Sequence, residues 1–271
     1  KLDSLHTSIS EALNSGDLTT LGTIIGNNPE ALAAAIAAPV GVEKTPVYPV
    51  ANFGSQMAPL YSILALWVGS VLMVVSMRSD VTDSNVVEGL AEADPLRATL
   101  TAKPVGLAAG YLGRYLIFAT IALAQATLVG LGDLYFLKVQ HVHPLQFMGT
   151  LWLTAIVFSF LMYTLIATFG NAGKALGVLL LVLQISGAGG AFPLAILPSF
   201  FSAISPFLPA THAITALRAS IAGYSGYEYG DAMWFLASFI LFAAFLGLAL
   251  RPLLVRSNRR MVAKLESTKL L

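Results

Sequence analysis

The stretch that decides the fold of this chain is LGVLLLVLQISGAGGAFPLAILPSFFSAISPFLPATHAITAL, residues 176–217. No Asp, Glu, Lys or Arg occurs between Lys174 and Arg218. The first half is long and apolar enough for a helix that crosses a bilayer, which takes about 20 residues. The second half is interrupted every few residues by prolines, which break a straight helix. These prolines are Pro193, Pro198, Pro206 and Pro209. The stretch therefore predicts a span followed by re-entrant helices over 193–223.

The composition is that of a chain whose main solvent is lipid. Hydrophobic residues make up 56% of the sequence and charged residues 11%, whereas a soluble domain carries roughly 25% charged residues. The net charge of +1 is too balanced for nucleic-acid binding, which needs a basic face. Cysteine is absent, which excludes disulfide scaffolds, thiolate metal sites and thiol catalysis.

The sequence predicts an all-α, polytopic membrane protein. The segments that meet the length of a span are 57–77 and, with approximate bounds, 111–132, 146–169, 175–192 and 232–250. We expect residues 1–50 to be the end of an extracellular domain or stalk with its connector. Residues 51–255 would form the transmembrane domain, and residues 256–271 a tail.

The basic residues are distributed unevenly between the two predicted sides of the membrane. Of the 15 Lys and Arg residues, eleven fall on the side of the tail and four on the other. The eleven are Arg78, Arg97, Lys103, Arg114, Lys174, Arg251, Arg256, Arg259, Arg260, Lys264 and Lys269. The positive-inside rule then makes the tail cytoplasmic and residues 1–50 extracellular. Five spans with an outside N-terminus predict a further span upstream.

Polar residues inside the predicted spans and the re-entrant segment each have a structural and a functional interpretation. Arg114 either extends its guanidinium to the headgroups, or pairs structurally, or makes a functional contact. Gln125 and Gln184 would form inter-helical hydrogen bonds or contact a substrate. Arg218 would anchor to lipid phosphate, cap carbonyl groups or help to close an outer gate.

The sequence contains no enzyme or metal signature that can be assigned. His141 and His143, with Asp133 nearby, supply too few ligands in a recognisable pattern for a metal site. The segment GNAGKALG, residues 170–177, is not a P-loop, because Ala175 follows Lys174 where Ser or Thr is required. We therefore assign no catalytic, cofactor-binding or metal-binding residue and expect a protein that is not an enzyme.

Two segments carry a resemblance to a known family. Residues 43–69 (EKTPVYPVANFGSQMAPLYSILALWVG) and residues 170–224 resemble the YhgE/Pip family, the phage infection proteins. The signatures lie at residues 52–55, 66–69, 184–193, 197–201 and 205–209. The resemblance covers nearly all of residues 43–255.

The resemblance implies the membrane domain of a type-2 ABC exporter. It implies six spans per protomer, a homodimer, a cytoplasmic coupling helix over 84–100 and re-entrant outer helices over 193–223. The coupling helix would contain Glu88, Glu92, Asp94, Leu96 and Arg97. The outer gate would contain Phe192, Pro193, Pro198, Pro206, Pro209 and Arg218. The family carries no catalytic motif and implies no cofactor.

Two functional hypotheses follow. The first is a permease subunit in a bacterial plasma membrane that exports an amphipathic or envelope-related substrate, driven by a separate nucleotide-binding ATPase subunit. The second is a scaffold without transport activity, a type-VII-like secretion accessory or a phage receptor that acts through its extracellular domain. In that case the partners would be secretion-system or phage proteins.

Overall fold

The computed structural model describes residues 46–77 and 107–250, together with Thr7 and Ser10, and within them it contains helices and no strands. The chain divides into two compact units, Lys1–Val47 and Tyr48–Leu271, and every helix discussed below belongs to the second. The predicted coupling helix over 84–100 and the tail 256–271 lie outside the described residues.

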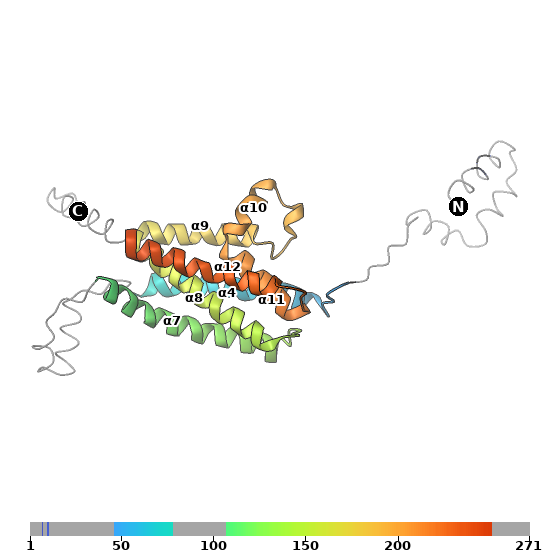
Figure 1. Cartoon of the computed structure of the whole chain (residues 1–271), viewed down its shortest axis with the longest axis horizontal. Coiled ribbons are helices and arrows are strands. Elements are labelled where there is room, and N and C mark those ends of the chain that lie inside the picture. The colour runs from blue at the N-terminus through green and yellow to red at the C-terminus, as the bar shows by residue number, and fades with distance from the viewer. Residues whose placement is uncertain (1–6, 8–9, 11–45, 78–106, 251–271) are drawn as a thin grey trace, which may run out of the picture. The chain divides into compact units, whose positions relative to one another are not determined.

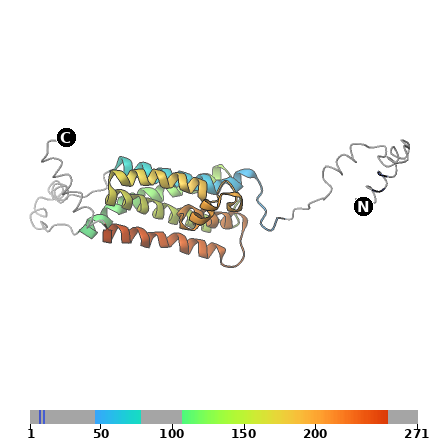
Figure 2. The ribbon, with the colours of Figure 1, turned by 90° about the horizontal axis from the view of Figure 1, so that it is seen from above.

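The second unit is a bundle of apolar helices (Figures 1 and 2). They are α4 (Phe53–Ser76), α7 (Leu107–Leu131), α8 (Pro144–Phe169), α9 (Asn171–Gly187), α10 (Ser199–Ile204), α11 (Pro209–Ala222) and α12 (Glu228–Phe245). A π-helical turn, Gly132–Phe136, continues α7, and another, Leu246–Leu250, continues α12. Four helices are long and apolar enough to cross a membrane, or up to five if a bent pair is one span. This confirms the predicted all-α, polytopic class.

Helix α8 is the centre of the bundle. It packs against α4, α7, α9, α11 and α12, and 83% of its most apolar window is buried. Several of its hydroxyl side chains form hydrogen bonds within the helix: Thr154 donates to the Thr150 carbonyl and Thr164 to the Phe160 carbonyl, both at 2.7 Å. Such local bonds allow hydroxyl groups to be buried without water.

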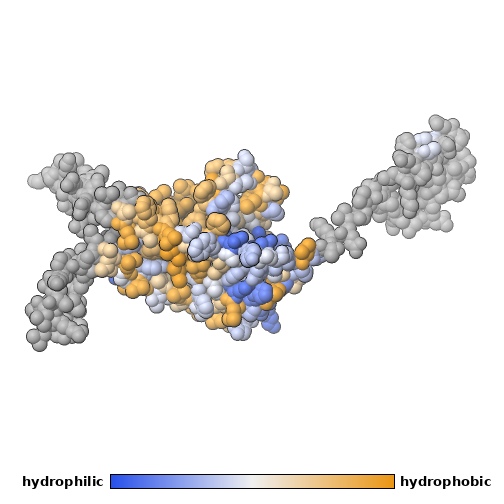
Figure 3. Space-filling view, in the orientation of Figure 1, coloured by the Kyte–Doolittle hydropathy of each residue, from blue (hydrophilic) through white to orange (hydrophobic). Residues whose placement is uncertain are grey.

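Helices α7 and α12 lie at the outside of the bundle. Only 22% of the most apolar window of each is buried, and their outer faces expose large apolar side chains. On α12 these are Trp234, Phe235, Leu241, Phe242 and Phe245, and Leu248 lies in the π-helical turn that follows. In Figure 3 hydrophobic residues cover most of the visible bundle, while hydrophilic residues gather near one end. This is the surface expected of helices in lipid.

The helix at the fourth predicted span lies earlier in the chain than expected: α9 runs from Asn171 to Gly187, whereas the prediction covered about 175–192. Helix α9 ends at Gly187 rather than near Phe192, because Gly189 and Gly190 follow and Gly189 adopts a φ of 68° that a helix does not contain. The chain then forms a 3-10 turn, Leu194–Ile196, before α10. The helical segments Ser199–Phe207 and Pro209–Ala222 meet at an angle of 83°.

Helices α4, α8 and α12 begin at one end of the bundle, and α7 and α9 reach their last residues at the same end (Figure 1). We call this the pocket end. Backbone hydrogen bonds join its loops: the amides of Val142 and His143 donate to the Ser220 carbonyl at 3.1 and 3.0 Å. Gln140 likewise donates its amide to the Ser55 hydroxyl at 2.9 Å. Segments far apart in the sequence are thus fixed to one another at this end.

Candidate functional site

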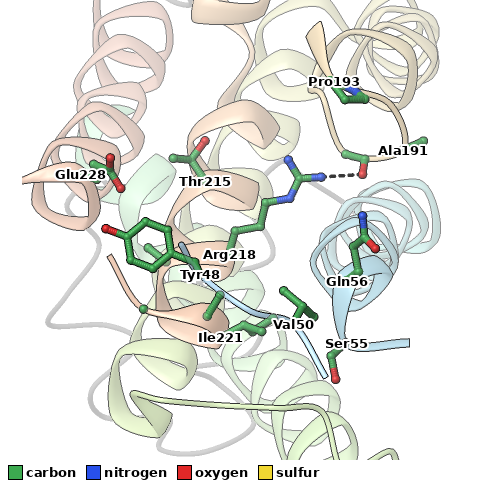
Figure 4. Close-up of a pocket in the computed structure, with 14 residues that line it drawn as sticks. Tyr48, Val50, Ser55, Gln56, Ala191, Pro193, Thr215, Arg218, Ile221 and Glu228 are labelled. Carbon is green, nitrogen blue, oxygen red and sulfur yellow. Dashed lines mark hydrogen bonds between the residues drawn. The ribbon is translucent and has the colours of Figure 1, made fainter. Parts of the chain in front are cut away.

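A pocket of about 650 Å³ opens where α11 meets the pocket end (Figure 4). Four segments contribute to its wall: the approach to α4, the loop after α9, the second half of α11 and the first turn of α12. The lining includes Tyr48, Val50, Ser55, Gln56, Gly190, Ala191, Pro193, Thr215, Arg218 and Glu228. We call this the Arg218 pocket. Its volume lies within the range of roughly 300–1,000 Å³ typical of ligand sites.

Arg218 links α11 to the loop that follows α9. Its Nη2 donates to the Gly190 carbonyl at 2.7 Å, and Figure 4 shows the side chain reaching from α11 toward this loop. The residue remains exposed, so part of the guanidinium faces the pocket. Glu228 lines the same pocket, but within the described ranges no carboxylate lies at ion-pair distance from Arg218. The pocket therefore presents both charges separately to a ligand.

Gln184 joins the end of α9 to the start of α11. Its Oε1 accepts a hydrogen bond from the Ala210 amide at 3.1 Å, which satisfies one of the free amides at the α11 N-terminus. The side chain is 4% exposed, and its Nε2 has no hydrogen-bond partner among the residues described. Pro209 occupies the first turn of α11, where a missing amide costs nothing.

The structure brings only part of the predicted outer-gate set into the pocket. Pro193 and Arg218 line it, whereas Phe192 is 61% exposed. Pro198, Pro206 and Pro209 instead shape the chain: Pro198 precedes α10, Pro206 opens a 3-10 turn, and Pro209 opens α11. The five predicted coupling residues lie outside the described part of the chain.

The polar residues predicted inside the spans do not come together in one site. Gln125 on α7 donates to the Ala65 carbonyl of α4 at 2.9 Å. Arg114 is half-buried on α7, toward the end opposite the pocket end. His141 contacts its own loop through the Val139 carbonyl at 2.8 Å, and the described residues contain no group of three or more side chains suited to a metal ion.

Several pocket residues were not predicted from the sequence. Tyr48, Gln56 and Thr215 carry no motif, and their only signal is proximity in sequence to predicted elements. Glu228 was part of the loop before the last predicted span, yet α12 begins with it. An acidic residue in the first turn of a helix is a recognisable N-terminal signal, and it could have placed this helix start correctly.

Comparison with known proteins assigns the chain to a family of membrane transporters. The chain belongs to the family described as ABC-2 family transporter protein, which matches residues 2–250. It is 26% identical over 215 residues to the uncharacterized protein YhgE of Bacillus subtilis (strain 168). That alignment covers 79% of this chain and 25% of the relative, so the chain spans about a quarter of the length of that protein. No solved structure matches.

These findings confirm the resemblance drawn from the sequence, a YhgE/Pip-like ABC-2 membrane domain. The chain is a multi-pass membrane protein of the permease type.

Proposed function

We propose that this chain is the permease domain of an ATP-driven exporter in a bacterial plasma membrane. It would act as a homodimer with a separate nucleotide-binding subunit, and its substrate would be an amphipathic or envelope-related molecule. The tail after Leu250 would be cytoplasmic and residues 1–50 extracellular. Family membership supports the permease role, and the bias of basic residues supports the orientation.

The observation that carries the proposal is the bent helix pair beside the Arg218 pocket. The two arms meet at 83°, and neither α10 nor the 3-10 turn Leu194–Ile196 contributes a buried residue. In contrast, most of α11 is buried against α4, α8 and α12. A weakly packed arm next to a firmly packed one is a structure that opens locally at low cost. In our proposal residues 190–208 are the outer gate, and the pocket beneath receives the substrate.

The gate proposal is testable with a reversible cross-link, because the chain contains no cysteine. A Cβ at Gly187 would lie 3.3 Å from Cδ1 of Phe201 in α10. The double variant Gly187→Cys with Phe201→Cys, treated with a short thiol-cleavable cross-linker, should therefore fix α10 to the end of α9. Phe201→Cys alone, treated identically, is the matched control.

The readout is ATP hydrolysis and substrate release by the full-length protein, isolated from its native membrane with its associated subunits. Cross-linking should stop release in the double variant, and cleavage of the cross-link should restore it. Unchanged release after complete cross-linking would exclude residues 190–208 as the gate.

The powered mechanism has a separate test. In our proposal the segment 84–100 receives force from the nucleotide-binding subunit, so Leu96→Ala with Arg97→Ala should uncouple ATP hydrolysis from transport. Mass spectrometry of the protein purified in mild detergent must first show a stoichiometric nucleotide-binding subunit. Purification without such a subunit would overturn the ATP-driven form of the proposal.

A further inference from the structure

A second cavity, of about 390 Å³, lies between the start of α4 and the end of α7. Most of its wall is apolar, and it includes Met57, Val129, Leu137 and Val139. Its polar part consists of Asn52, Tyr61, Ser62 and Asp133. Among the described residues, Asp133 is the one charged side chain that is buried, at 7% exposed. We call this the Asp133 cavity.

The position of Asp133 is unfavourable for a carboxylate in two respects. It lies in the π-helical turn Gly132–Phe136 that follows α7, at the negative end of a long helix dipole. It is surrounded mainly by apolar groups, which solvate an anion poorly. A charge kept in such a place needs a compensating partner.

The hydrogen bonds within the protein compensate this carboxylate only in part. The Ser62 hydroxyl lies 2.5 Å from Oδ2 of Asp133 and 2.8 Å from the Ala58 carbonyl, and its single hydrogen serves one of them at a time. Lys138 is close in sequence but exposed, and within residues 46–77 and 107–250 no cationic side chain forms an ion pair with Asp133. A cationic ligand would complete the compensation of this carboxylate when it is ionised.

The chemistry of the wall favours an organic cation over a metal ion. A hard metal ion requires about six oxygen ligands, and here the Asn52 side-chain oxygen is already bonded to the Ser55 amide at 2.7 Å. At the rim, by contrast, stand the rings of Phe53, 72% exposed, and Tyr61, 63% exposed. Aromatic faces attract organic ammonium groups, and apolar walls accept their alkyl substituents.

We propose that the Asp133 cavity binds an organic ammonium group of about the size of choline, with Asp133 as its counter-ion and Tyr61 as an aromatic wall. The site is separate from the Arg218 pocket and from the gate. It does not depend on ATP-driven transport, because binding at equilibrium needs no nucleotide.

The test is equilibrium binding of choline to the chain in nanodiscs of phosphatidylglycerol, a lipid without an ammonium group. The matched ligand is 3,3-dimethylbutan-1-ol, which has the shape of choline without its charge. Choline should bind saturably, and the neutral alcohol about tenfold more weakly or worse, because a desolvated charge pair is lost. Equal affinity for the two ligands, or no saturable choline binding, would overturn the proposal.

Variants locate the site. Asp133→Asn keeps the size of the side chain and should weaken choline binding about tenfold or more, while Glu228→Gln, which removes a carboxylate from the other pocket, should not. Tyr61→Ala changes only an exposed rim residue and should weaken choline binding about threefold, with Tyr61→Phe close to the unchanged protein. Choline affinity that is unaffected by Asp133→Asn, or by Tyr61→Ala, would exclude the site.

Discussion

Replacing Gly69 by alanine tests how α4 and α7 pack. A Cβ at Gly69 would fall on the side-chain amide of Gln125, which donates to the Ala65 carbonyl one turn earlier on α4. The Gln125 side chain would have to move, and its inter-helical hydrogen bond would break. Gly113 on α7 is the matched control, because a Cβ there meets nothing within 4 Å.

The size of the effect follows from three contributions. Loss of the hydrogen bond costs about 0.6–1.7 kcal/mol in a membrane protein. Crowding of a packed contact adds about 1–3 kcal/mol. Alanine has a higher helix propensity than glycine, which stabilises the folded protein by about 1 kcal/mol. We therefore expect Gly69→Ala to lower the free energy of unfolding by about 0.6–3.7 kcal/mol, whereas Gly113→Ala raises it by up to about 1 kcal/mol.

The assay is reversible unfolding in dodecylmaltoside micelles with an increasing fraction of SDS, followed by tryptophan fluorescence. A double-mutant cycle with Gln125→Ala isolates the contact: once Gln125 is truncated, Gly69→Ala should become harmless. The interaction energy should be about 1–3 kcal/mol. Strict additivity of the two substitutions, or equal stability of Gly69→Ala and Gly113→Ala, would refute the reasoning.

Three further predictions follow. Gly173→Ala should lower the free energy of unfolding by more than about 3 kcal/mol in the same assay. The added Cβ would collide with the backbone of Leu165, which cannot rotate away as a side chain can. A loss below about 1 kcal/mol would contradict this. Gln184→Met should lower the free energy of unfolding by about 0.5–1.5 kcal/mol, because the unsatisfied Nε2 disappears but the buried Ala210 amide loses its acceptor in exchange. A loss above about 3 kcal/mol would mean that Nε2 has a partner. Arg218→Ala should accelerate proteolysis of the 190–208 segment, because the hydrogen bond from Arg218 to the Gly190 carbonyl is lost. Arg218→Lys should show an intermediate rate. Identical digestion rates for the two variants and the unchanged protein would show that this bond does not hold the segment.

The sequence by itself determined the helical class of the protein and the place of most of its long apolar helices. Apolar runs without charge define the helices because a bilayer admits only backbone that is hydrogen-bonded internally. Glycine at 189 and 190 and proline at 209 end one helix and begin another, and both effects are local to the backbone. This is why the all-α, polytopic class could be predicted, although the predicted helix to about Phe192 overlooked the two glycines.

Only the tertiary structure decided which helix lies at the centre. Helices α8 and α12 have similar hydropathy, 1.9 and 2.2, yet 83% of one window is buried and 22% of the other. Lipid is as apolar as a protein interior, so hydropathy does not distinguish a helix that faces lipid from one that faces other helices. The same limit applies to the two sites. Arg218 meets Gly190, and Ser62 meets Asp133, across long intervals of sequence. These contacts depend on how the helices pack, and no local sequence pattern predicts that packing.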